Sequence, residues 1–186
     1  ESTVNVLVLV GSLRKESYNR KMAHALARLA PATLALEIVE IRDLPLFDQD
    51  FEKPLPPAVA TFKSRIQDAD AVLFVTPEYN RSVPGVLKNA IDCGSRPYGT
   101  SAWSGKPGGV VSVSVGAIGG FGANHHLRQS MVFLDVPMMS QPEAYVGNAS
   151  ALFDAAGEVA QAETREFLQR YMAAFADWVG RHAAGR

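Results

Sequence analysis

The sequence has a single cysteine among its 186 residues, so it cannot form an internal disulfide. It has no apolar run close to the roughly 20 residues of a membrane-spanning helix, and its first residues lack the basic start of a secretory signal. It also has no basic cluster, because 18 lysines and arginines are matched by 19 acidic residues. These absences argue against an exported, membrane-bound or nucleic-acid-binding protein, and we expect a cytoplasmic one.

The length and composition fit one globular domain. The chain is 47% hydrophobic and 20% charged, which are ordinary values for a globular protein. A chain of this length buries roughly 70% of its unfolded surface, so it needs neither a metal nor a disulfide to fold. We therefore expect a single domain over residues 1–186.

Short apolar segments alternate with helical patterns along the chain. An open parallel sheet with helices on both faces follows from this alternation, and such α/β sheets bind ligands at the carboxyl ends of their strands. The chemistry is therefore expected in the loops after the first, third and fourth strands. The expected strands are 4–10, 34–41, 71–76, 109–115 and a short one between 136 and 146, and the expected helices are near 22–29, 59–67, 86–92, 124–134 and 160–182.

The loop after the first strand, "GSLRKESYN", is rich in hydrogen-bond donors. It matches neither G-x-G-x-x-G nor the P-loop pattern. Ser12, Arg14, Ser17 and Asn19 instead supply hydroxyl, guanidinium and amide donors just before a helix, whose N-terminus also attracts anions. The pattern favours a phosphate monoester as ligand. The alternative is that Ser17 and Asn19 only cap the helix while Arg14 is solvated.

Two further loops can approach a flat ligand. In "TPEYNRSVPG" two prolines stiffen the chain, and Glu78, Tyr79 and Asn80 lie at the tip of the loop. A rigid loop of this kind can place backbone groups beside a heteroaromatic ring. The segment "SVSVGAIGGFG" contains four glycines, which allow the backbone to come close to a ligand.

Four segments in this order, "GSLRKESYNR", "PEYNRSVPGVLKNAID", "SRPYG" and "SVSVGAIGG", resemble the NAD(P)H-dependent FMN reductases. The sequence looks most similar to bacterial members described as chromate, quinone or azo reductases. The resemblance implies a flavodoxin-like three-layer sandwich with a five-stranded parallel sheet. It also implies ping-pong hydride transfer from NADPH or NADH to bound FMN and on to quinones, chromate or similar acceptors, with no catalytic side chain.

The resemblance assigns binding roles to individual residues. Arg96 first, and Arg81 second, are expected to attract the anionic dinucleotide or acceptor, the alternative being that both are solvated surface arginines. The residues expected to bind FMN are Ser12, Arg14, Ser17 and Asn19 at the phosphate, Pro77, Glu78, Tyr79 and Asn80 along the ribityl chain and ring, and Ser112 and Gly116 beside the ring.

Three other expectations concern metals, packing and assembly. No metal site is expected, because the adjacent His125 and His126 point about 100° apart on a helix. Where many relatives have a tryptophan after "KNAID", this chain has Cys93 and then Gly94, so less aromatic bulk is expected there. Family members pair as dimers or as dimers of dimers, and a homo-oligomer, a tetramer first, is expected.

Two other functions compete with this interpretation. One is a flavodoxin-type electron carrier that does not oxidise NAD(P)H directly, but such carriers are usually strongly acidic and this chain is not. The other is a phosphoryl or nucleotide enzyme on the same fold, for which the chain has no matching nucleophile or metal carboxylates. A small-molecule electron acceptor remains the expected partner.

Overall fold

The structure, a computed structural model, describes residues 2–183, so the single domain expected over residues 1–186 includes four residues outside this range. Within it, none of the helices is both long and apolar enough to cross a bilayer. The sheet is parallel throughout, in the order β2-β1-β3-β4-β5. Its elements are β1 (Val4–Val10), α1 (Tyr18–Leu29), β2 (Leu34–Val39), α2 (Pro57–Asp68), β3 (Ala71–Thr76), α3 (Gly85–Ser95), β4 (Gly108–Val113), α4 (Phe121–Phe133), β5 (Tyr145–Val146) and α5 (Ala162–Ala183).

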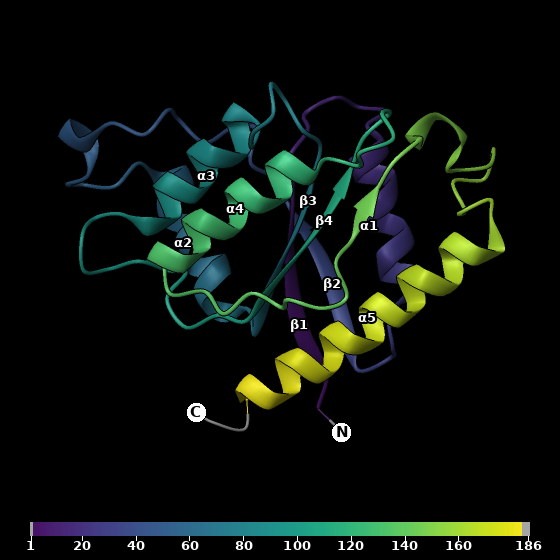
Figure 1. Cartoon of the computed structure of the whole chain (residues 1–186). Helices are drawn as coiled ribbons and strands as arrows, with labels where there is room; N and C mark the ends of the chain where they lie inside the picture. The colour runs from purple at the N-terminus through teal and green to yellow at the C-terminus, as the bar shows by residue number, and fades with distance from the viewer. Residues whose placement is uncertain (1, 184–186) are drawn as a thin grey trace.

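The molecule has three layers, with the sheet between two groups of helices. Helices α1 and α5 cover one face of the sheet, and α2, α3 and α4 cover the other (Figure 1). Along β1, Val6 and Val8 belong to the core on the α1 and α5 side, whereas Leu7 and Leu9 belong to the core on the opposite side. Both faces are buried, which explains why the strands are nearly continuous apolar runs in the sequence. The expected flavodoxin-like fold is confirmed.

Some element boundaries differ from the expected ones. Strand β2 ends at Val39 rather than at residue 41, although Ile41 is still buried in the core on the α2 side. Helix α4 begins at Phe121, three residues earlier than expected, after the left-handed Gly120. In both places the hydrophobic pattern continues past a point where backbone geometry changes, so the pattern alone cannot fix the boundary.

The strand order changes direction between β1 and β3, which is where open α/β sheets bind their ligands. These strands are neighbours in the sheet, but the helices that follow them, α1 and α3, pack on opposite faces, so the two loops diverge. At the end of β1 the chain lies tightly against β3. A Cβ atom on Gly11 would lie 2.6 Å from Oγ1 of Thr76. The glycine of "GSLRKESYN" is therefore required by packing against Thr76.

Candidate functional site

Three loops lie together at the carboxyl edge of the sheet, along the top of Figure 1. They are residues 11–17 after β1, 77–84 after β3 and 114–120 after β4. Asn19 Nδ2 donates to the carbonyl of Val113 at 3.3 Å and so joins the first loop region to the end of β4. The site residues expected on these three loops are thus brought to one edge.

Ser17 caps helix α1. Its hydroxyl oxygen accepts from the backbone N–H groups of Asn19 at 3.1 Å and of Arg20 at 3.4 Å. The capping and ligand-binding interpretations of this serine are compatible, because an accepting hydroxyl keeps its own proton for donation to an anion. Ser12 is also buried, and its oxygen accepts from the backbone N–H of Arg14 at 3.4 Å.

The loop around Arg14 offers donors that have no acceptor. The Arg14 side chain is exposed, donates from Nη2 to the carbonyl of Glu16 at 3.0 Å and lies 5.4 Å from the centre of the Tyr18 ring. Within residues 2–183, no group accepts from the backbone N–H of Leu13 or Lys15. Helix α1 has no acidic residue in its first turn, so the positive end of its dipole is not neutralised. This combination suits an anion.

The Asn19 side chain is oriented differently from a phosphate donor. The amide orientation of Asn19 is fixed by the carbonyl oxygen of Val113, which accepts from Nδ2. The opposite orientation would place Oδ1 of Asn19 against that carbonyl oxygen. Its Oδ1 atom is buried, and no donor reaches it from the described residues. A buried acceptor of this kind fits a hydroxyl group of a ligand rather than a phosphate oxygen.

The loop after β3 is a tight turn. The backbone groups of Tyr79 and Ser82 bond to each other in both directions, at 3.1 and 3.0 Å. Between them, Asn80 and Arg81 both have left-handed backbones, with φ of 52° and 65°. Such a pair of positive φ angles is typical of a type I′ turn, although arginine rarely adopts it. The turn leaves Tyr79 half exposed at the tip.

The carboxylate of Glu78 binds the start of helix α4. Its Oε1 accepts from the backbone N–H of Ala123 at 3.2 Å, in the first turn of α4. A Cβ atom on Gly122 would collide with this same oxygen. A carboxylate at a helix N-terminus is favoured by the helix dipole, so Glu78 fixes the loop after β3 against α4.

Ser112 holds the loop after β4 from inside. It is fully buried, donates to the carbonyl of Gly119 at 2.7 Å and accepts from Asn124 Nδ2 at 3.2 Å. The loop it supports is exposed at Gly116. The hydroxyl of Ser112 is thus occupied within the protein, and the backbone around Gly116 is the part that a flat ligand can approach.

The structure does not bring Arg96 to this edge. Arg96 follows the last residue of the 11-residue helix α3, so it lies about 16 Å along the helix from the loop after β3. Its guanidinium pairs with Glu52 Oε1 at 2.8 Å and lies 5.4 Å from the centre of the Phe47 ring. Arg81, in contrast, is exposed in the tight turn at the site.

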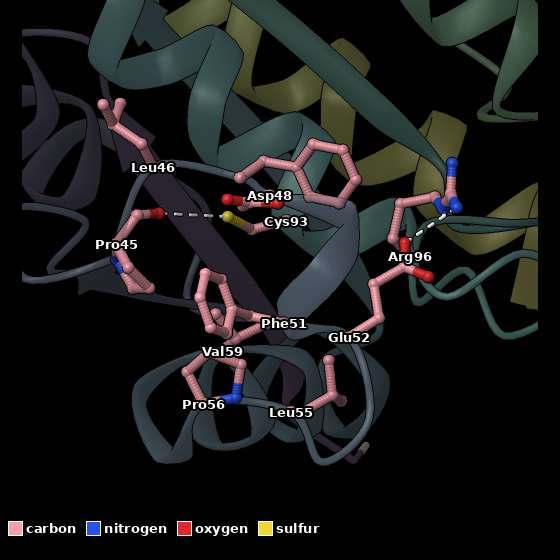
Figure 2. A pocket seen from close by; sticks show the side chains of 11 residues that line it. Pro45, Leu46, Asp48, Phe51, Glu52, Leu55, Pro56, Val59, Cys93 and Arg96 are labelled. Atoms are coloured by element: carbon pink, nitrogen blue, oxygen red, sulfur yellow. Dashed lines mark hydrogen bonds and ion pairs between the residues drawn. The ribbon is translucent and has the colours of Figure 1, made fainter.

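Arg96 borders a second, mostly apolar cavity of about 150 Å³ between α3 and residues 45–59 (Figure 2). Cys93 lines it, and its Sγ donates to the carbonyl of Pro45 at 3.6 Å. Burial, reinforced by the charge of Asp92, raises the pKa of the Cys93 thiol. Cys93 is therefore a packed, protonated thiol. Trp103 packs over the neighbouring Gly94, so aromatic bulk is present on that side of α3 after all.

Sequence reasoning missed a polar cluster beside α4. His125 Nε2 lies 2.7 Å from the Tyr145 hydroxyl, which donates to Glu143 Oε1 at 3.0 Å. The rings of His125 and Tyr145 are stacked, with Phe121 next to both. His125 and Tyr145 are 20 residues apart, so no helix or strand periodicity in the sequence connects them. The pairing of β5 with β4 brings them together.

The two adjacent histidines have different partners. His125 bonds to Tyr145, and His126 Nδ1 lies 2.8 Å from Oγ of Ser82. Over residues 2–183, no group of three histidine, cysteine or acidic side chains is arranged to hold a metal ion. The chemistry available at this edge is therefore that of anion binding, hydrogen bonding and ring contacts.

Comparisons with known proteins agree on one family. The family model described as NADPH-dependent FMN reductase matches residues 4–151. A quinone reductase of Pseudomonas putida is 65% identical over 176 residues, 94% of each chain. A 2-hydroxy-1,4-benzoquinone reductase of Burkholderia sp. is 48% identical over 95% of this chain and 96% of its own. The structure of FerB, a flavoenzyme NAD(P)H:(acceptor) oxidoreductase from Paracoccus denitrificans, has a TM-score of 0.91 and 43% identity, and the match covers 97% of this chain and 99% of that chain.

Proposed function

The chain belongs to the NADPH-dependent FMN reductase family, and we propose that it is a cytoplasmic quinone reductase whose FMN lies at the carboxyl edge of the sheet. Membership of the family confirms the expected FMN cofactor and NAD(P)H reductant. The observation that carries the placement is the cluster of free donors around Arg14, at a helix N-terminus without acidic residues. The one free thiol, Cys93, is buried, which is compatible with a reducing compartment.

The residues at this edge fit FMN from one end to the other. The phosphate dianion can accept from Arg14, from the Ser12 and Ser17 hydroxyls and from the free backbone N–H groups. The buried Oδ1 of Asn19 can accept from a ribityl hydroxyl. The isoalloxazine ring can lie between Pro77, Glu78, Tyr79 and Asn80 in the loop after β3 and, on the other side, Ser112 at the end of β4 and Gly116 in the loop after it.

Bound FMN supplies the hydride chemistry, and the protein supplies position. Glu78 and Ser112 hold the two ring-side loops in place through Ala123 and Gly119. The exposed Tyr79 and the loop at Gly116 leave an open approach for a flat nicotinamide or quinone. Because the same open face of the flavin ring receives both the nicotinamide and the quinone, reductant and acceptor bind in turn. A ping-pong scheme follows. Arg81, at the same turn, is the basic side chain placed to attract an anionic reductant.

Quinones are the acceptor class that we assign, and chromate remains a prediction. A quinone is flat and can stack on the ring as the nicotinamide does. Chromate is a compact tetrahedral anion, and of Arg96 and Arg81, the two side chains expected to attract an anionic acceptor, Arg81 lies at this edge, whereas Arg96 is paired with Glu52 at the other end of α3.

The first test is the visible spectrum of the purified protein with anaerobic NADPH. We expect a flavin spectrum that bleaches directly on addition of NADPH and returns on addition of 1,4-benzoquinone. Parallel lines in double-reciprocal plots would establish the ping-pong order. A flavin that does not bleach without a partner reductase would favour the flavodoxin-type carrier, and a colourless protein that takes up no FMN would refute the flavin site.

We also propose that the protein is a homo-oligomer, because apolar side chains are exposed near the end of α4. Val132 and Phe133 are 81% and 86% exposed, and Tyr98 is 89% exposed. Phe133 and Tyr98 border the same groove beside α3. Multi-angle light scattering should give two or four times the chain mass of 20.0 kDa, and Phe133→Asp should lower it. A monomeric mass for the unmodified protein would contradict this proposal.

A further inference from the structure

The polar cluster beside α4 forms a continuous hydrogen-bonded chain. Glu143, from the loop before β5, accepts from the hydroxyl of Tyr145 at 3.0 Å. The same hydroxyl oxygen lies 2.7 Å from Nε2 of His125, in the second turn of α4. His125 is exposed, so one end of this hydrogen-bonded series reaches solvent.

The hydrogen-bonded series Glu143–Tyr145–His125 lies next to the loops of the proposed flavin site. The first turn of α4 is bound to Glu78 through the N–H of Ala123. A Cβ atom on Gly122 would lie 2.6 Å from the carbonyl oxygen of Arg81, so the turn after β3 touches the start of α4. On the other side, Gly119 packs directly against the backbone of Tyr145. An acceptor at the ring would therefore be a neighbour of His125.

Glu143 sets which group donates in each of the two hydrogen bonds. Glu143 can only accept when ionised, so the Tyr145 hydroxyl donates to it and uses its own oxygen to accept from His125. Burial and the bond to Glu143 raise the pKa of Tyr145 to about 12, so this phenol keeps its proton. In the neutral imidazole the proton is thereby fixed on Nε2, and Nδ1 is the nitrogen that takes up a second proton from solvent and can give it to a ligand.

Quinone reduction requires a proton from another source than the reductant. A quinone takes up two electrons and two protons to form a hydroquinone. NAD(P)H supplies both electrons and one proton as a hydride equivalent. The second proton must come from water or from a protein group close to the quinone oxygen.

We propose that His125 gives this second proton, and that Tyr145 and Glu143 position it. The inference rests on the proposed quinone reductase function. In the step, the Nδ1–H bond of the His125 imidazolium breaks and an O–H bond forms on the quinone. His125 becomes neutral with its remaining proton on Nε2, and solvent returns a proton to Nδ1.

Other charged groups around His125 are compatible with this role. Arg128, one turn further along α4, bonds through Nε to Asn124 and through Nη1 to the carbonyl of Met139, and its charge acts on the pKa of Tyr145 in the direction opposite to burial and Glu143. His126 bonds to Ser82 in the turn after β3. Glu78 contacts the start of α4 from that turn, Arg81 approaches Gly122 there through its backbone carbonyl, and Glu143 lies on the side of β5.

The experiment compares two acceptors in the FMN-loaded enzyme. 1,4-Benzoquinone needs protons for its reduction, whereas ferricyanide takes only electrons. His125→Asn should lower kcat/KM for benzoquinone about tenfold and leave the ferricyanide rate within twofold, and Tyr145→Phe should act in the same direction but less. Imidazole in the buffer should restore benzoquinone reduction to His125→Ala. His24→Asn, an exposed histidine on α1, is the matched control and should change neither rate.

A second readout does not depend on turnover. In ¹⁵N-labelled protein, the His125 ring should show the tautomer with its proton on Nε2, and Tyr145→Phe should convert it to a mixture. A ring that already shows mixed tautomers in the unmodified protein would overturn the positioning role.

The remaining outcomes distinguish a failure of the role proposed for His125 from a failure of the proposed quinone reductase function. Equal losses with both acceptors, together with a smaller mass in light scattering, would show that His125 acts in folding or assembly and would overturn the inference. Unchanged benzoquinone rates would overturn it as well. If the unmodified enzyme oxidises NADPH with ferricyanide but reduces no quinone, the proposed acceptor class fails, whatever the variants do.

Discussion

Replacing Arg14 by alanine is expected to weaken FMN binding by about 10- to 100-fold. A charge-assisted hydrogen bond to a phosphate contributes about 1.5–3 kcal/mol, and each 1.4 kcal/mol is a factor of about ten in Kd. The Arg14 side chain is exposed, and its contacts within residues 2–183 are one hydrogen bond to the carbonyl of Glu16 and the neighbouring Tyr18 ring, so its removal should leave the fold intact. Quenching of flavin fluorescence on titration of the apoprotein gives the Kd directly.

A matched variant and a matched ligand isolate the phosphate contact. Lys15→Ala removes a neighbouring exposed positive charge from the same loop and should weaken FMN binding by less than threefold. Riboflavin lacks the phosphate, so its affinity should be the same for Arg14→Ala and for the unmodified protein. Equal losses for FMN and riboflavin, or equal effects of the two variants, would show that Arg14 does not contact the phosphate.

Replacing Trp103 by alanine should have the largest effect on stability, about 3–5 kcal/mol. The indole is fully buried between Phe62 and Phe74, with ring centres 6.1 and 5.8 Å away. Its Nε1 donates to the carbonyl of Ile91 in α3 at 2.9 Å. Alanine would leave a large cavity and remove the hydrogen bond to Ile91, and the midpoint of urea unfolding, followed by circular dichroism, should fall accordingly.

Trp103→Phe divides this loss into two parts. Phenylalanine fills much of the volume but has no N–H for Ile91, so about 1–3 kcal/mol should be lost through the missing hydrogen bond and the smaller ring. Gly94 lies against the indole with no room for a Cβ atom, so the smaller ring also loses part of this close contact with α3. A loss below 1 kcal/mol for Trp103→Ala would mean that the core collapses freely around this position.

The sequence was most informative where one pattern dominates locally. Strands β1 and β3 agree with the expected residues, because buried parallel strands are continuous apolar runs. The donor loop after β1 could also be found, since all its members lie within eight residues of one another. The expectation for Ser17 was incomplete rather than misplaced: it caps α1 and still has a proton to donate.

Long-range placement was beyond the sequence. Arg96 lies in "SRPYG" and was expected at the site, but helix α3 has to end before it, and the helix length separates it from the loop after β3. Its partner Glu52 lies in an irregular loop, where no periodicity predicts a contact. In the same way, no local pattern shows that Glu78 would cap α4, because the contact depends on how β3 and β4 pair.

The left-handed turn at Asn80 and Arg81 has a consequence for the energetics of cofactor binding. Each strained backbone conformation costs about 1–3 kcal/mol, and here the cost is met during folding, since the turn is closed by two hydrogen bonds within the chain. The loop therefore loses little conformational entropy when the cofactor arrives. At the proposed flavin site, a preorganised turn of this kind makes the intrinsic contact energy available as affinity, because this turn already has its final shape before the cofactor binds.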